Sequence, residues 1–318
     1  MIDDRLAAPA TSAEPRRGRF WPWAVAAAIL AFLLWRTPLG ELARAVERGP
    51  SLALVGYSCV ALLAVFVADV WATRVALAAV GVRLNSRVLV AVRGTTHLLG
   101  LVNFTAGQGT LAYYLVRLGT PVASAAGSVL FLVAVSGLSL AALGVAGLAW
   151  APPFEGGWGR LLVVGALAGI AGTLAVIVLR PRWLTRWAWA GPLFSAGRRG
   201  WLAAIGSRVA HLLLFALLYW GAVRIWSIPI PVDEALAIIV ALTFVAAVPI
   251  TPYGLGTVQA AQIVLFARYL PEMEPGAREA SILAFSLVHY AASMATQAAL
   301  GFLCYLDWRR LTSAAPHP

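Results

Sequence analysis

The stretch TPYGLGT (251–257) interrupts an apolar run that reads VALTFVAAVPITPYGLGTVQAAQIVLF. Pro249 and Pro252 lack a backbone N–H and disfavour helix at the residue before them. Gly254 and Gly256 allow positive φ angles and close approach of neighbouring backbone. At membrane depth, irregular backbone persists only where protein or a water-filled cavity satisfies its polar groups. The stretch therefore predicts a broken helix inside the membrane rather than an uninterrupted transmembrane helix.

The composition is typical of a membrane protein. Of 318 residues, 61% are hydrophobic and 12% are charged, whereas a soluble domain has about a quarter of its residues charged. Several apolar runs exceed the roughly 18 residues that cross a bilayer. The net charge of +11 comes from arginines beside these runs. It therefore indicates topology signals and contacts with anionic membrane lipids, and nucleic acid is not expected as a partner.

No sequence motif for chemistry stands out. Cys59 and Cys304 each lie in an apolar run, and the four histidines lack zinc spacing, so neither a disulfide nor a metal site is expected. The chain contains no phosphate-binding P-loop and no Gly-x-Ser-x-Gly nucleophile motif. We therefore expect no cofactor and no enzymatic activity.

The apolar runs predict an all-α polytopic membrane protein with about six transmembrane helices. These are expected at about 21–38, 51–73, 121–150, 160–180, 201–226 and 279–306. Two further apolar stretches, 86–118 and 233–270, are interrupted by polar, glycine or proline residues. Tryptophans cluster near the proposed helix ends, as expected for side chains at the membrane interface.

Positive charge predicts the orientation of these helices. Arginines at 16–19, 74–93, 180–199 and 309–310 mark the cytoplasmic side, and the loop APPFEGGWG (151–159) marks the outside. This pattern holds only if neither interrupted stretch, or both, cross the membrane, and we prefer two re-entrant hairpins. The expected protein lies in a bacterial cytoplasmic (inner) membrane with both termini in the cytoplasm. Its expected parts are a flexible tail at 1–19, one transmembrane domain at 20–310 and a tail at 311–318.

The first interrupted stretch contains VNFTAGQGTLAYYLVR (102–117), which resembles the second one. The aligned residues are Gly107 with Gly254, Gly109 with Gly256, Thr110 with Thr257 and, after a slip of one residue, Thr105 with Thr251. Each hairpin lies between two crossings, in units at about 51–150 and 201–306, and the charge pattern gives the units opposite orientations. This predicts an inverted-topology repeat, as in many secondary transporters. The alternative is two unrelated packing kinks.

The two breaks are candidate anion sites. Thr110 and Thr257 are good N-cap residues for the helices that follow. The unpaired N–H groups and the positive end of each half-helix would favour a negatively charged group.

The segment VPITPYGLGTVQAAQIVLF (248–266) also resembles the signature Pro-x-Thr-Pro-Gly-Gly-Leu-Gly-x-x-Glu of the membrane region of lysylphosphatidylglycerol synthase/flippase proteins. The matching positions are Pro249, Thr251, Pro252, Gly254, Leu255 and Gly256. The resemblance extends over roughly 20–310 and implies a stand-alone, flippase-like membrane domain without the synthase domain. Tyr253 stands where the family has Gly, and Gln259 where it has Glu. If that acid handles a proton or a cationic headgroup, Gln259 argues against a lysyl-lipid as substrate.

Polar residues inside the apolar runs are further candidates for substrate binding. Arg208 and His211 lie on one helix face and either reach toward the interface or contact a lipid phosphate. Arg117 either serves likewise or marks an interface. Asp69 is expected to pair with Arg74 or Arg93. The other candidates for lining the path are Gln108, Gln259, Gln262, His289 and Gln297.

The favoured function is translocation of an anionic phospholipid or a polyprenyl-phosphate-linked lipid between leaflets. One alternative is a non-catalytic accessory subunit that presents a lipid-linked substrate to a separate lipid-modifying or glycosyl transferase. Another is an intramembrane transferase, which would need His289 or Asp69 as a base.

Overall fold

The computed structural model describes residues 21–101, 104–150, 157–247 and 250–313, and every regular element in them is helical. The expected tail at 1–19 therefore lies outside the described residues. The elements are α1 (Trp21–Arg36), α2 (Leu39–Arg48), α3 (Ser51–Ala79), α4 (Ser86–Gly100), α5 (Phe104–Arg117), α6 (Val122–Trp150), α7 (Gly157–Leu179), α8 (Arg182–Thr185), η2 (Ala188–Ala190), α9 (Gly191–Ser195), α10 (Gly197–Ile225), α11 (Val232–Ala247), η3 (Pro252–Gly254), α12 (Thr257–Phe266), η4 (Ala267–Tyr269) and α13 (Pro275–Ser313).

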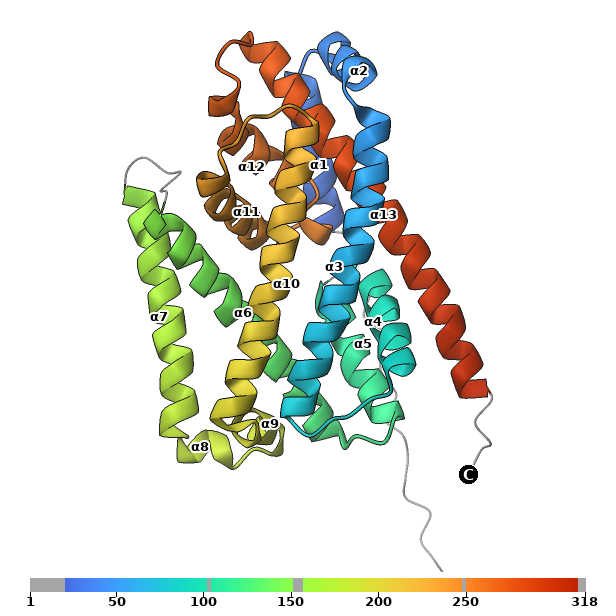
Figure 1. Cartoon of the computed structure of the whole chain (residues 1–318), viewed down its shortest axis with the longest axis vertical. Coiled ribbons are helices and arrows are strands. Elements are labelled where there is room, and N and C mark those ends of the chain that lie inside the picture. Colours follow the sequence, from blue (N-terminus) through green and yellow to red (C-terminus); the bar gives the residue numbers. More distant parts are fainter. Residues whose placement is uncertain (1–20, 102–103, 151–156, 248–249, 314–318) are drawn as a thin grey trace, which may run out of the picture.

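Within the described part of the chain, four helices are long and apolar enough to cross a membrane, namely α3, α6, α10 and α13. A helix of 29 residues such as α3 is about 44 Å long, more than the roughly 30 Å hydrocarbon core. The chain is therefore a polytopic membrane protein. Figure 1 shows α3 and α10 side by side along the long axis, with α13 inclined behind them.

The expected crossing at 21–38 takes a different form. α1 has 16 residues, or about 24 Å, and is followed by α2 at an angle of 92°. Only together do these two helices meet the length and composition of a fifth span. The sequence did not predict α2, because its ten residues carry charges and no long apolar run. α7, with 23 residues, lies where the crossing at 160–180 was expected, and the total of six crossings remains a prediction.

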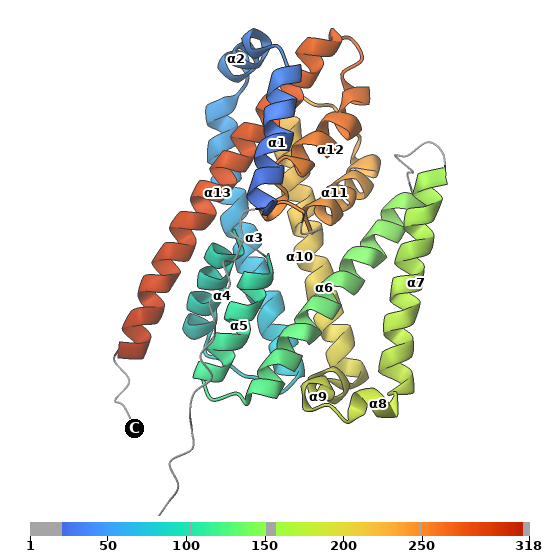
Figure 2. The ribbon, with the colours of Figure 1, turned by 180° about the vertical axis from the view of Figure 1, so that it is seen from behind.

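Both interrupted stretches form pairs of short helices. α4 packs against α5, and α11 packs against α12. None of the four exceeds 16 residues, so each is at most about 24 Å long and none crosses a bilayer core alone. In both views the α4–α5 pair lies toward one end of the molecule and the α11–α12 pair toward the other (Figures 1 and 2).

The apolar core is divided into two clusters. The first joins the end of α3 to α4, α5, α6 and the start of α10, and the second joins the start of α3 to the end of α10, α11 and α12. On α3, Leu54 belongs to the second cluster and Ala76 to the first, with buried Ser58, Asp69 and Thr73 between them. α10 and α13 also carry buried polar residues between their contributions to the two clusters. We call this band of buried polar side chains the polar layer; its members on these three helices are Ser58, Asp69, Thr73, Ser207, Arg208, Ser286 and Gln297.

Candidate functional site

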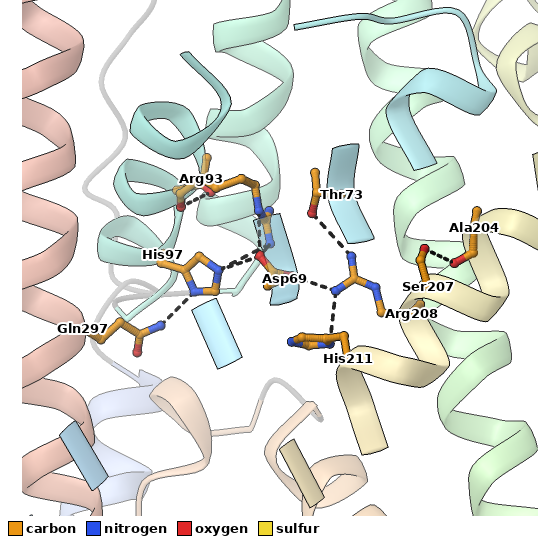
Figure 3. A network of polar contacts seen from close by, with 10 residues as sticks. Asp69, Thr73, Arg93, His97, Ala204, Ser207, Arg208, His211 and Gln297 are labelled. Atoms are coloured by element: carbon orange, nitrogen blue, oxygen red, sulfur yellow. Dashed lines mark hydrogen bonds and ion pairs between the residues drawn. The ribbon is translucent and has the colours of Figure 1, made fainter. Parts of the chain in front are cut away.

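The polar layer is centred on Asp69, which points from α3 toward α4 on one side and α10 on the other (Figure 3). Arg93 donates from Nε and Nη2 to Asp69 Oδ2, at 2.9 and 2.6 Å. Arg208 donates from Nη1 to the other oxygen, Oδ1, at 2.7 Å. The carboxylate therefore joins three helices through its two oxygens. The expected pairing of Asp69 with Arg93 is confirmed, whereas Arg74 instead contacts Ser86 Oγ at 3.1 Å.

The central pair of charges is buried. Asp69 is 4% exposed and Arg208 is 7% exposed, and the guanidinium group of Arg208 is directed at Asp69 inside the helix bundle. An isolated charge at this depth would be strongly destabilising, and it persists because ionic partners and hydrogen bonds satisfy it. We call Asp69 and the side chains that contact it the Asp69 cluster. Among the described residues, this cluster has one carboxylate, that of Asp69, for the two guanidinium groups of Arg93 and Arg208. With neutral histidines, it carries one uncompensated positive charge.

Arg208 also has hydrogen-bonding capacity left over. Its Nη2 lies 3.5 Å from Thr73 Oγ1, and its Nη1 lies 3.5 Å from His211 Nδ1. Arg208 and His211 are thus neighbours, as their spacing on one helix face predicted. Arg208 Nε is buried and has no hydrogen-bond partner among the described residues. An N–H group of this kind is costly to leave unpaired, so it is a donor available to an additional acceptor.

His97 extends the cluster to α13. Its Nε2 lies 3.1 Å from Asp69 Oδ2, and its Nδ1 lies 2.9 Å from Gln297 Nε2. Both contacts are satisfied when His97 carries its proton on Nε2 and accepts from Gln297 at Nδ1. The His97 side chain is 28% exposed, so it is more accessible than those of Asp69, Arg93 and Arg208. Gln297 therefore belongs to the polar layer, and its expected role in lining a substrate path stays a prediction.

His289 belongs to a second, uncharged group of polar residues. Its Nδ1 lies 2.8 Å from Ser58 Oγ, and its ring meets Tyr219 edge-on. Tyr219 is in turn hydrogen-bonded to Gln262, whose buried Oε1 has no partner in the described segments. This group joins α3, α10, α12 and α13. Thus His289 and Gln297, expected on one face of a cavity, contribute to two different groups.

The second break is closed by its own side chains. Gln259 Oε1 accepts from the Gly256 N–H at 2.6 Å, and Thr257 Oγ1 donates to the Gly254 carbonyl at 3.0 Å and lies 3.2 Å from Thr251 Oγ1. The N-cap residue of α12 is Gly256, with φ of 86°, so the prediction of Thr257 as N-cap is wrong. A Cβ on Gly256 would lie 3.0 Å from Ile29 Cβ, so only glycine lets α1 approach this closely.

Other residues of this break have simpler roles. Pro252 is buried in η3, while Pro249 lies outside the described residues. Gly254 has φ of 73° and Tyr253 has φ of 52°. This region of backbone conformation favours glycine, which accounts physically for the glycine that the family signature carries at the position of Tyr253.

The Gly-x-Gly-Thr motif of the first interrupted stretch does not form the predicted break. α5 begins at Phe104 and includes the Gly-x-Gly-Thr motif in its first half, so the motif is helical here and not a counterpart of the bend at Gly254. Thr110 donates to the Ala106 carbonyl at 2.7 Å within the helix, and its prediction as N-cap is wrong. Thr105 lies in the first turn, with its side chain outside the described set.

The remaining first-break candidates separate by environment. A Cβ on Gly107 would lie 2.9 Å from the Thr96 carbonyl oxygen, so this glycine permits close packing of α5 on α4. Gly109 faces open space, Gln108 is half-buried, and Arg117 is exposed at the end of α5. The structure brings none of them into the Asp69 cluster.

Comparison with protein families gives a match over residues 20–301 to the lysylphosphatidylglycerol synthase TM region. The chain belongs to this family. A search of curated proteins finds no match. The residues that decide the polar layer, from Asp69 to Gln297, all fall within the matched region of this lysylphosphatidylglycerol synthase TM family member.

Arg93 and His97 are members of the cluster that sequence reasoning did not select as substrate contacts. A usable signal was present, because the two residues lie four apart in an apolar stretch and so share one helix face. Tyr219 and Ser58 gave no comparable signal, since single hydroxyl groups are frequent in membrane helices. Among the described residues, no group of three His, Cys, Asp or Glu side chains could hold a metal ion.

Proposed function

We propose that this protein translocates an anionic lipid, either a phospholipid or a polyprenyl-phosphate-linked lipid, between the leaflets of a bacterial cytoplasmic membrane. The observation that carries this proposal is the Asp69 cluster, in which one buried carboxylate faces the buried guanidinium group of Arg208 and the partly buried one of Arg93. The uncompensated positive charge favours a phosphate, and arginine is well suited to phosphate because its N–H groups match the oxygens in pairs.

The unpaired Arg208 Nε supports the same assignment. A phosphate oxygen would accept from this N–H and remove the penalty of leaving it unpaired. His97 offers a more exposed approach to the cluster. In this proposal the headgroup contacts Arg93 and Arg208 in the polar layer, while the lipid tails remain in the bilayer.

The proposed architecture has six crossings and two re-entrant hairpins that enter from opposite faces, with both termini cytoplasmic. The positions of the α4–α5 and α11–α12 pairs toward opposite ends of the molecule support it (Figure 2). In an inverted repeat, rocking one unit against the other exposes a central site alternately to each side. The polar layer between the two core clusters is a suitable position for such a site.

The test is translocation in vesicles that contain the purified protein. A fluorescent phosphatidylglycerol and a fluorescent phosphatidylcholine are compared, with quencher added outside to report lipid that reaches the outer leaflet. We expect faster exchange of the anionic lipid than of the zwitterionic one. A folded protein that accelerates no labelled anionic lipid, whether phosphatidylglycerol or a polyprenyl phosphate, would refute translocation and favour the accessory subunit, for which co-purification with a transferase is the expected result.

A further inference from the structure

A separate cavity of about 360 Å³ lies where α3 ends and α4 begins. Its lining includes Arg74, Leu77, Val82, Arg83, Leu84 and Leu89. None of these residues belongs to the Asp69 cluster. The cavity therefore requires its own explanation.

The turn between α3 and α4 builds this cavity. Gly81 has φ of 83°, a conformation that glycine adopts without strain, and the Val82 N–H donates to the Leu77 carbonyl at 2.9 Å. The side chain of Asn85 then starts α4 by accepting from the Arg87 N–H at 2.9 Å. Both helix ends are thus fixed, and the cavity between them is shaped by regular backbone contacts.

The floor of the cavity is apolar and its rim is positive. Leu77 and Leu89 are each 1% exposed, whereas Arg74 and Arg83 are exposed. Within the described chain, no carboxylate forms an ion pair with either arginine, although nearby Arg87 is paired with Asp307 at 2.6 Å. The rim therefore has two guanidinium groups without a negative partner.

The position of the cavity along α3 favours a lipid as its ligand. It lies at the end of α3, a helix long enough to span the bilayer, so its rim is at the depth of lipid headgroups and its floor borders the acyl region. Arginines at this depth attract anionic lipids, and leucine side chains suit the first methylenes of an acyl chain. We propose that this cavity is a binding site for an anionic glycerophospholipid, with Arg74 and Arg83 contacting its phosphate and Leu77, Leu84 and Leu89 contacting a chain.

The experiment measures binding and does not depend on transport. Purified, delipidated protein in detergent is titrated with phosphatidylglycerol, and bound lipid is counted by native mass spectrometry. The Arg74→Gln/Arg83→Gln protein should bind the tightest lipid about 30-fold more weakly, from about 1 kcal/mol for each arginine near the membrane surface. Arg83→Gln alone, which removes no hydrogen bond or ion pair between described residues, should weaken binding about fivefold.

The matched control is Arg198→Gln/Arg199→Gln. These exposed arginines are at the same end of the molecule, because a Cβ on neighbouring Gly200 would lie 3.0 Å from Ala79 Cβ at the end of α3. The control removes the same charge outside the cavity and should bind as the unmodified protein does. Unchanged binding in the cavity variants, or an equal loss in the control, would overturn the proposal. Displacement by glycerol 1-phosphate at equal concentration would also overturn it, because the ligand would then be a soluble phosphate and not a lipid.

Discussion

Asp69 accepts hydrogen bonds from Arg93 and Arg208, which lie on different helices, and both guanidinium groups depend on it for neutralisation. A buried ion pair contributes little net stability compared with apolar residues, but removing one partner leaves an uncompensated charge. The role of this residue was predictable in part, because an acid inside an apolar run requires a cation. The contact between Arg208 and Asp69 was not predictable, because the sequence does not give the rotation of α10 relative to α3.

Asp69→Asn is therefore expected to lower the free energy of unfolding by about 3–5 kcal/mol, because the buried guanidinium group of Arg208 and the partly buried one of Arg93 lose their counter-charge. Unfolding by SDS in mixed micelles measures the change. The double variant Asp69→Asn/Arg208→Met should recover part of the loss, because one unpaired charge is removed with it. Asp307→Asn, which removes a carboxylate from an exposed pair with Arg87, is the control and should have a much smaller effect. Equal losses at Asp69 and Asp307 would contradict the account.

Gln259 provides a second test at this scale. Its Oε1 caps the Gly256 N–H, and its buried Nε2 has no hydrogen-bond partner within the part of the chain that the structure describes. Gln259→Met should lower the free energy of unfolding by about 1–3 kcal/mol, because it leaves a buried N–H unpaired. Gln259→Glu retains the acceptor at the positive end of α12 and should be less harmful. The same SDS titration measures both free energies of unfolding. A greater loss of stability for Gln259→Glu than for Gln259→Met would show that the capping contact is unimportant.

At the scale of helices, hydropathy located the long elements but not the details of the broken ones. The run at 51–73 corresponds to α3, which continues to Ala79, and the run at 201–226 corresponds to α10, which already begins at Gly197. The Gly-x-Gly-Thr motifs suggested matched breaks, yet only the second motif forms one, because the first lies inside α5. There, Gly107 permits close packing of α5 on the backbone of α4. Close packing of this kind depends on tertiary structure, and a local motif does not contain it.

Gly107→Ala and Gly109→Ala form a matched pair that tests this packing. A Cβ on Gly107 would lie 2.9 Å from the Thr96 carbonyl and 3.1 Å from Gly100 Cα, whereas one on Gly109 meets nothing within 4 Å. Gly107→Ala should lower the thermal unfolding midpoint, because backbone atoms must separate. Gly109→Ala should leave it unchanged or raise it, since alanine favours helix by up to about 1 kcal/mol. Equal midpoints would show that α4 and α5 are not in tight contact.

At the scale of the whole molecule, two apolar clusters enclose a polar layer on α3, α10 and α13. Composition predicted the membrane class, and charge predicted an orientation that remains to be tested. The polar layer itself required the structure, because its residues are far apart in the sequence and each one alone has an ordinary structural interpretation.

The orientation can be tested with two single cysteines in protein whose Cys59 and Cys304 are replaced by alanine. Trp183, 65% exposed in α8, lies at one end of the molecule, and exposed Glu272 precedes α13 at the other (Figure 1). An impermeant maleimide added to intact cells reaches only the outer side of the membrane. It should therefore label Glu272→Cys and not Trp183→Cys. Labelling of both from the same side would contradict the six-crossing topology.

The most direct test of the central claim is the translocation rate of labelled phosphatidylglycerol by Arg208→Gln protein in vesicles. Arg309→Gln, an exposed arginine near the end of α13, is the matched control, and both proteins are first shown to be folded. Loss of a charge-assisted contact worth about 1.5–3 kcal/mol should slow translocation at least about tenfold, while the control keeps the unmodified rate. If Arg208→Gln transports the lipid as fast as Arg309→Gln, the buried cluster does not bind the headgroup and the account is wrong.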